Sequence, residues 1–242
     1  TDFSIDKETY LRWFEQIQAT GANVLRIYTI QSDDFYEAFY EYNINREQPL
    51  YLLHGVWVND YIQNSHRDAY ATDFLDVLLQ DCRTVVDVLH GNKKISLGRM
   101  ASAGSGFYRW DISQWVVGYI LGVEWEDVTV VYTDEKYEGV AGYTSYEGKY
   151  LYSSPEATPF EAMLAQVGDS IIAYESERYR QQRLVAFSNW PTTDPFLYPD
   201  KVSDYFMKCA QVDVEHIKST EAFLAGQFAS YHVYPYYPDY LS

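Results

Sequence analysis

The run Trp115-Val116-Val117-Gly118-Tyr119-Ile120-Leu121-Gly122-Val123-Glu124-Trp125 is an almost uninterrupted apolar segment that delivers a carboxylate near its end. Its content of β-branched and aromatic residues predicts a strand buried on both faces, as in a parallel sheet. In barrels of alternating strands and helices, chemistry is placed at the carboxyl ends of the strands. Glu124 is therefore the first candidate for a catalytic residue.

Helices and strands are predicted to alternate on both sides of this segment. Apolar residues recur at helical spacing in several segments, the first of which begins at Asp6, a capping residue, and ends at Gly21. The predicted helices cover residues 6–21, 35–42, 74–89, 160–174 and 201–220. The predicted strands cover residues 23–30, 49–58, 115–125, 183–190 and 226–234. Residues 126–156 are expected to form a loop.

Alternating units of this kind indicate a parallel sheet, which is either closed as a barrel or open and doubly wound. No glycine-rich phosphate fingerprint follows a predicted strand, which weakens the nucleotide-binding form of the open sheet. We therefore expect an α/β fold of the (β/α)8 TIM-barrel type, with residues 1–242 forming one domain. The apolar content, 47%, is enough to fill a large core.

Composition limits the partners. A formal charge of -17 argues against nucleic acid, whose phosphates need a basic surface. No apolar run approaches the roughly 20 residues that cross a bilayer. The five histidines show no metal-ligand spacing, so neither a metal nor another cofactor is expected. Cys82 and Cys209 lie on predicted helices far apart in sequence, and buried free thiols are favoured over a disulfide.

The chain is rich in aromatic residues, with 25 Tyr and 6 Trp. Most of them are explained by packing between helices and sheet. Several fall near strand ends, where pockets of this fold are found. Flat rings beside hydroxyl groups suit sugars, whose C–H faces stack on aromatic rings. Packing therefore explains most single aromatic residues, and a carbohydrate ligand stays open for those at strand ends.

These residues resemble a known family. Arg26 and Tyr28 in Val24-Leu25-Arg26-Ile27-Tyr28, Glu124 at the end of a later strand, and His232 and Tyr234 in Tyr231-His232-Val233-Tyr234 are similar to the signature of retaining glycoside hydrolases of clan A. The nearest subset is the β-glucanosyltransferase-like barrels, in which Gly-Ala-Asn precedes the Arg-Ile-Tyr strand. The resemblance covers nearly the whole chain, and implies that its strands are the second to the sixth of eight.

The resemblance also implies roles for particular residues. Glu124 would be the general acid/base, desolvated by Trp125 and the apolar walls of its strand. Arg26 would hold the nucleophilic carboxylate ionised. His232 and Tyr234 alternate along one strand, so both point to one side, where the related enzymes contact the substrate or the nucleophile. The substrate-binding candidates are Arg26, Tyr28, His54, Trp57, Trp125, Asn189, Trp190, His232 and Tyr234.

Two carboxylates leave alternatives open. Glu126 competes with Glu124, because a continuing strand would place both on the same side. Asp194 ranks with Asn189 and Trp190 as a pocket candidate at a strand end, but Asp before Pro195 is more commonly a turn residue.

Two departures from the family pattern bear on function. The clan usually has Asn before the acid/base glutamate, to bind the sugar 2-hydroxyl, whereas this chain has Val123. A retaining mechanism also needs two carboxylates about 5 Å apart. The clan carries the nucleophile on strand seven, and this chain reaches Asp239-Tyr240-Leu241-Ser242 before such a strand. We expect a longer protein, with the nucleophile beyond residue 242.

Three functions are considered. The first is a retaining glycoside hydrolase or transglycosidase acting on a β-linked oligo- or polysaccharide, with Glu124 as acid/base. The second is a non-catalytic carbohydrate-binding barrel, which Val123 allows. The third is an unrelated barrel enzyme that uses a metal or phosphate. Polysaccharide chemistry favours a location outside the cell or on its surface.

Overall fold

The computed structural model describes residues 5–58, 67–96, 104–206 and 208–234. Two parts of the sequence analysis lie outside the described residues: residues 239–242, after which the strand with the nucleophile is expected, and His66, one of the five histidines. The chain divides into two compact units. The first unit comprises residues 1–57 and 81–120, and the second comprises residues 58–80 and 121–242.

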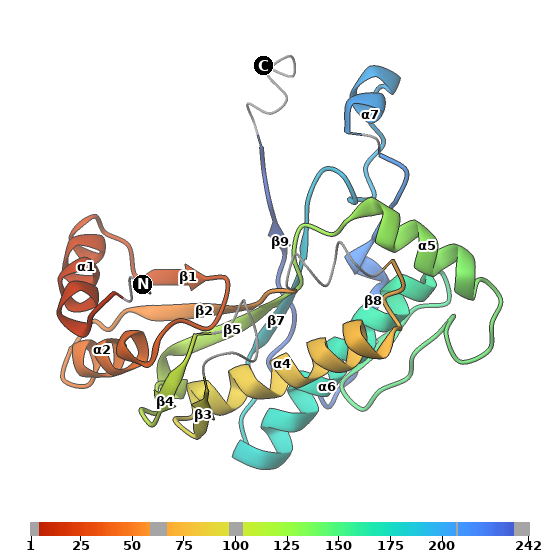
Figure 1. Ribbon diagram of the computed structural model, residues 1–242. Coiled ribbons are helices and arrows are strands. Elements are labelled where there is room, and N and C mark those ends of the chain that lie inside the picture. The colour runs from red at the N-terminus through yellow and green to blue at the C-terminus, as the bar shows by residue number, and fades with distance from the viewer. Residues whose placement is uncertain (1–4, 59–66, 97–103, 207, 235–242) are drawn as a thin grey trace. The chain divides into compact units, whose positions relative to one another are not determined.

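The first unit contains parallel strands covered by aromatic helices. Strand β1 pairs in parallel with β2, with Val24 opposite Tyr51 and Ile27 opposite His54, and β5 follows β2 in the strand order (Figure 1). β3 and β4 form an antiparallel pair. The elements are α1 (Lys7–Ala19), β1 (Val24–Ile27), α2 (Asp33–Asn43), β2 (Tyr51–Val56), the second half of α4 (Thr72–Leu89), β3 (Lys93–Ile95), β4 (Gly106–Tyr108), the 3-10 turn η1 (Ser113–Trp115) and β5 (Val116–Leu121), whose last residue belongs to the second unit.

Sequence signals account for this unit well. The Asp6 carboxylate accepts a hydrogen bond from the Thr9 amide at 2.9 Å and so caps α1, and Gly21 adopts a φ of 92° after the helix. Phe14 of α1 packs edge-to-face against Phe35 and Phe39 of α2, with ring centroids 5.6 Å apart in both pairs. These contacts join the two helices through their predicted apolar stripes.

The second unit contains another parallel pair and the longest helix. Strand β7 pairs in parallel with β9, with Ser188 opposite Ser230 and Asn189 opposite Tyr231. β6 and β8 are antiparallel. The elements are the first half of α4, α5 (Asp127–Tyr137), β6 (Leu151–Ser153), α6 (Pro159–Tyr179), β7 (Leu184–Asn189), α7 (Asp200–Phe206), the 3-10 turn η2 (Val214–His216), β8 (Ile217–Ser219) and β9 (Ser230–Tyr231).

Helix α6 begins with a complete capping box. The Thr158 hydroxyl accepts a hydrogen bond from the Glu161 amide, and the Glu161 carboxylate accepts one from the Thr158 amide at 2.8 Å. The helix buries Phe160, Met163 and Leu164, as the spacing predicts. The chain is therefore a mixed α/β protein with parallel strands, as expected.

Residues 126–156 are not a loop, which corrects the sequence interpretation. They contain α5 and β6. Helix α5 buries Thr129 and Thr133 together with Val130 and exposes Val128, so it has no apolar stripe. Apolar spacing in the sequence therefore does not predict it. The Thr133 hydroxyl accepts a hydrogen bond from the Ala69 amide at 2.9 Å, which explains a polar residue on the inner face.

The predicted helix over 201–220 is right in its first part and wrong in the rest. Among the described residues of this range, α7 supplies the α-helix up to Phe206, and from residue 208 the chain runs through η2 into β8. The Val212 amide donates to the Thr193 carbonyl at 2.7 Å, and the Asp213 amide donates to Glu161 at 2.6 Å. These tertiary hydrogen bonds hold the segment extended in spite of its helical spacing.

Strand ends and one cysteine differ as well. β5 covers 116–121 instead of 115–125, because Gly122 turns the chain with a φ of 95°. β9 is confined to Ser230–Tyr231, although backbone hydrogen bonds with β7 extend from Gly226 to His232. Both cysteines are free, but only Cys82 is buried, while Cys209 is exposed and lies outside a helix.

Candidate functional site

Two side chains from the C-terminal part of the second unit hold the Glu124 carboxylate. His232 Nδ1 lies 2.7 Å from Glu124 Oε1, and the Tyr234 hydroxyl donates to the same oxygen. The side chain of Glu124 is 26% exposed and that of His232 is 10% exposed. The structure thus brings together three of the predicted site residues, and the Glu124 side chain is partly exposed.

The loop that carries Glu124 is built around Trp125. This indole is fully buried, packs edge-to-face on Phe160, and donates from Nε1 to the Ser188 carbonyl at 3.2 Å. Trp190 in turn donates from its Nε1 to the Trp125 carbonyl at 3.0 Å. Two indole hydrogen bonds therefore fix the backbone beside Glu124.

Glu126 lies differently from Glu124. Since β5 ends before Gly122, the two carboxylates do not lie on a continuing strand, and Glu126 occupies the N-cap position of α5. Glu126 therefore does not share a strand face with Glu124, which was the reason for considering it as a competitor.

The strand pair β7 and β9 positions His232. Its amide donates to the Asn189 carbonyl at 2.9 Å, continuing the parallel ladder past Tyr231. Its ring nitrogen Nε2 lies 3.4 Å from the Ser188 hydroxyl oxygen. Ser188 is completely buried. The sequence interpretation gave Ser188 no role, although a hydroxyl one residue before the end of an apolar strand is a signal worth testing.

Asn189 is buried, and its amide group is used inside the protein. Nδ2 donates to the Val212 carbonyl at 2.8 Å, and Oδ1 accepts from the Thr193 hydroxyl and from the Trp190 amide. This arrangement ties the end of β7 to the segment before η2. Asn189, like Trp125, therefore lies away from an open binding surface in this structure.

Tyr231, the residue before His232, takes part in a buried network around the charged pair of Asp194 and Lys208. The Asp194 carboxylate, which is completely buried, pairs with the Lys208 ammonium at 2.9 Å and accepts hydrogen bonds from the hydroxyls of Tyr198 and Tyr231. Burial and the hydrogen bond to Asp194 raise the pKa of Tyr231. Asp194 also accepts from the Phe196 amide at 3.0 Å, which is the expected turn contact.

In the first unit, Arg26, Tyr28 and Trp57 form one group at the ends of β1 and β2. The Arg26 guanidinium lies 4.7 Å from the centroid of the Tyr28 ring, and the Trp57 ring meets Tyr28 edge-to-face at 5.3 Å. Tyr28 is 48% exposed. An exposed tyrosine backed by a cation and an indole offers a flat surface of the kind that sugars stack on.

His54 lies in the core of the first unit. It is completely buried, with Nδ1 donating to the Gly55 carbonyl and Nε2 accepting from the Tyr36 hydroxyl, each at 2.8 Å. Burial lowers the pKa of His54 to about 4, while the bond to Gly55 opposes this shift. His54 is thus a neutral histidine that supports the packing of α2 on β2.

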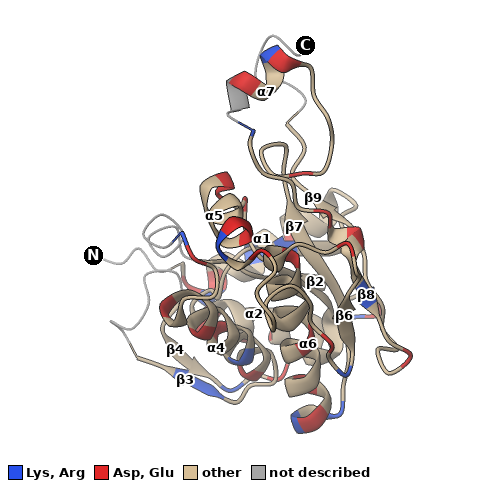
Figure 2. Ribbon diagram, turned by 90° about the vertical axis from the view of Figure 1, so that its right-hand side faces the viewer, with Lys and Arg blue, Asp and Glu red and all other residues tan. Residues whose placement is uncertain are grey.

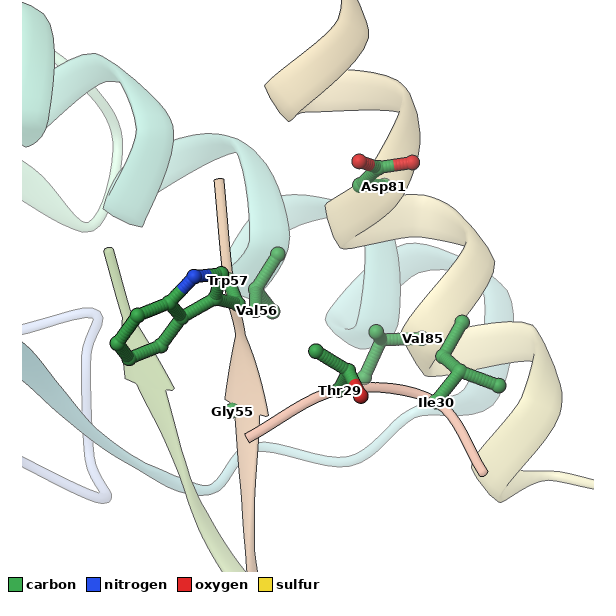
Figure 3. Close-up of a pocket in the computed structure, with 7 residues that line it drawn as sticks. All are labelled: Thr29, Ile30, Gly55, Val56, Trp57, Asp81 and Val85. Carbon is green, nitrogen blue, oxygen red and sulfur yellow. The ribbon is translucent and has the colours of Figure 1, made fainter. Parts of the chain in front are cut away.

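A small cavity of about 20 Å³ lies between α4 and the ends of β1 and β2 (Figure 3). This volume is enough for about one water molecule. Asp81 of α4 lies at its wall, and burial raises the pKa of this carboxyl to about 6. The cavity is lined by Thr29, Ile30, Gly55, Val56, Trp57, Asp81 and Val85.

Metal-binding clusters and membrane-spanning helices are considered for the part of the chain that the structure describes. Within it, no cluster of three or more His, Cys, Asp or Glu side chains is arranged to hold a metal ion. None of its helices combines the length and apolar character that spanning a membrane requires. Acidic residues recur along α1, α2, α5 and α6 (Figure 2).

Comparison of the chain with protein-family models, curated proteins and solved structures gives no match.

Proposed function

We propose that this protein is a retaining β-glycoside hydrolase or transglycosidase that acts on a β-linked oligo- or polysaccharide, with Glu124 as general acid/base. The proposed fold is a (β/α)8 barrel of the clan A type, to which the parallel strands described above contribute. The second carboxylate of the mechanism, the nucleophile, is proposed to follow residue 242 in the full-length protein.

One observation carries the proposal. Glu124 is a part-exposed carboxylate whose Oε1 receives hydrogen bonds from His232 and Tyr234, over 100 residues later in the chain. All three are among the residues that the resemblance selects, with Glu124 on one predicted strand and His232 and Tyr234 together on a later one. A carboxyl group with one oxygen held by donors and with access to solvent is suited to exchange a proton with a glycosidic oxygen. The exposed Tyr28 adds support for a sugar ligand.

A specific observation favours a second candidate function, a non-catalytic carbohydrate-binding barrel. Val123, which replaces the asparagine of the clan, is completely buried. An apolar, buried side chain at this position supplies no amide to the sugar 2-hydroxyl, and hydrogen bonds at that hydroxyl strengthen in the transition state. A site that has lost this contact retains sugar binding more easily than turnover.

The full-length protein and its Glu124→Gln variant, compared on β-linked oligosaccharides, separate the two functions. An acid/base role predicts that turnover falls about 10²–10⁴-fold while oligosaccharide binding persists. Glu138→Gln, at the exposed C-cap of α5, is the matched control and should leave both unchanged. Binding without turnover by the unmodified protein would favour the binding barrel, and the absence of both would overturn the carbohydrate proposal.

A second measurement isolates the acid/base step. An aryl β-glycoside with a good leaving group needs no proton to depart, so the Glu124→Gln variant should still form the glycosyl-enzyme. Added azide, which attacks without general base help, should then restore turnover and yield the β-glycosyl azide. Failure of azide to restore any turnover would remove Glu124 from this role.

A further inference from the structure

We infer that Ser188 is a positioning residue of this site, which holds the His232 ring so that Nδ1 faces Oε1 of Glu124. The inference rests on the proposed function, in which Glu124 donates and then removes a proton. It starts from contacts at both nitrogens of one ring: His232 Nδ1 lies 2.7 Å from Glu124 Oε1, and Nε2 lies 3.4 Å from Ser188 Oγ.

The chemistry of the partners decides where the ring hydrogen lies. An ionised carboxylate only accepts hydrogen bonds, so a neutral His232 carries its hydrogen on Nδ1 and donates to Glu124. Nε2 is then unprotonated and needs a donor, because the side chain is 10% exposed. The Ser188 hydroxyl is that donor, and it can turn to satisfy the nitrogen without moving a heavier atom.

Tyr234 is the second donor to this carboxylate. Its hydroxyl donates to Oε1, the same oxygen that accepts from His232. Two donors therefore converge on one oxygen of the carboxylate, and the orientation of the His232 ring sets one of them.

A serine, a histidine and a glutamate in this order also occur in acyl-transfer enzymes, where the serine is the nucleophile. Burial argues against that role here. Ser188 is completely buried on β7, and its carbonyl is tied to the Trp125 indole at 3.2 Å. A substrate carbonyl has no access to the hydroxyl, so Ser188 acts through His232.

The test compares Ser188→Ala with Ser188→Thr in the full-length protein labelled with ¹⁵N-histidine. The readout is the His232 Nδ1–H resonance, identified by its loss in His232→Gln. A ring held at both nitrogens predicts a slowly exchanging Nδ1–H in the unmodified protein and in Ser188→Thr, which keeps the hydroxyl, and its loss in Ser188→Ala. A persistent resonance in Ser188→Ala would overturn the inference.

Kinetics on an aryl β-glycoside give the second readout. Loss of one neutral hydrogen bond predicts a kcat about 3–10-fold lower in Ser188→Ala, with KM unchanged and activity restored in Ser188→Thr. A lower melting temperature with unaltered kcat would mean that Ser188 only stabilises the fold, and would overturn the inference. If Ser188→Ala does not fold, Ser188→Cys, with a weak donor of similar size, should weaken both readouts in the same direction.

The two proposals fail separately. The resonance reports the His232 contact in the absence of any substrate. Turnover that depends on Glu124, combined with a resonance that ignores Ser188, would overturn the inference alone. A resonance that depends on Ser188 in a protein that turns over no glycoside would overturn the proposed function and leave the His232 contact standing. Labelling of Ser188 by a fluorophosphonate would identify it as a nucleophile and overturn its positioning role.

Discussion

His232 Nδ1 lies 2.7 Å from Oε1 of Glu124, although 108 residues separate the two in the chain. The contact depends on two independent pieces of local structure. The turn at Gly122 and the buried Trp125 fix the glutamate, and the parallel pairing of β7 with β9 fixes the histidine. Changes that disturb either piece should therefore affect the pair.

The first prediction concerns the close approach of Gly122 to Trp125. An added Cβ at Gly122 would lie 2.2 Å from Cζ2 of the Trp125 ring, and the residue has a φ of +95°. Since the indole is fully buried, it has little room to move. We expect Gly122→Ala to lower the free energy of unfolding by about 3 kcal/mol, from steric overlap and backbone strain together.

Gly226→Ala is the matched control, measured beside Gly122→Ala by urea unfolding of the full-length protein. Gly226 has a φ of +88°, but a Cβ there meets no atom within 4 Å. Backbone strain alone predicts a loss of about 1–2 kcal/mol. Equal losses in the two variants would show that the contact with Trp125 contributes nothing.

The second prediction concerns the buried pair Asp194 and Lys208. Their side chains are 0% and 6% exposed. Lys208→Met leaves the carboxylate with uncharged donors, the hydroxyls of Tyr198 and Tyr231 and the Phe196 amide, so a loss of about 3–5 kcal/mol is expected. Because removing both charges leaves neither uncompensated, Asp194→Asn with Lys208→Met should lose less than the sum of the single losses.

An exposed ion pair provides the comparison for this cycle. Lys136 lies 2.5 Å from Asp68, and its side chain is 44% exposed. Lys136→Met should cost far less than Lys208→Met, because an exposed pair is screened by solvent. Additive losses for Asp194 and Lys208 in thermal melts would contradict the network as described.

The elements that sequence predicts well are those whose signals are local. Asp6 caps α1 and Gly21 follows it, as expected, and the apolar spacing from Phe160 to Tyr174 predicts α6. Helix α5 was missed because Thr129 and Thr133 face inward, which no local hydrophobic pattern reveals. The helix prediction is wrong for the segment after α7. Hydrogen bonds to Thr193 and Glu161 hold this segment extended, and both partners are distant in sequence.

The candidate site shows the same division. Position at a strand end singled out Glu124, and alternation placed His232 and Tyr234 on one side, which agrees with their shared contact to Oε1. Neither signal indicated that Trp125 would be fully buried, or that Ser188 would reach His232. Those contacts depend on how β7 and β9 pair, and pairing partners are distant in sequence.

The third prediction concerns the pH dependence of stability through His54. Its pKa is about 4 in the folded protein against 6.5 for an ordinary histidine. Between these values the unfolded chain binds more protons than the folded protein, so stability falls as pH decreases from about 6.5 to about 4. The shift corresponds to a loss of up to about 3 kcal/mol.

The measurement for His54 is the free energy of unfolding of the unmodified protein and of His54→Gln, from pH 7 to pH 4. Removal of the imidazole should flatten the decline between those limits, because a glutamine binds no proton. Parallel curves for the two proteins would contradict a neutral, buried His54.

The fourth prediction has the opposite sign and concerns Asp81, at the cavity of Figure 3. Burial raises the pKa of this carboxyl from 3.8 to about 6. Between those values the folded protein binds more protons than the unfolded chain, so this group destabilises the fold above pH 6 and ceases to do so as pH falls to about 4. Asp81→Asn should therefore stabilise the protein at pH 7, by about 1–2 kcal/mol, and by less at pH 4.

Asp76→Asn, at an exposed position of the same helix, controls for the loss of one charge and should change stability little at either pH. Destabilisation by Asp81→Asn at pH 7 would mean that the ionised carboxylate has a stabilising partner, and would contradict burial as the main cause of its raised pKa.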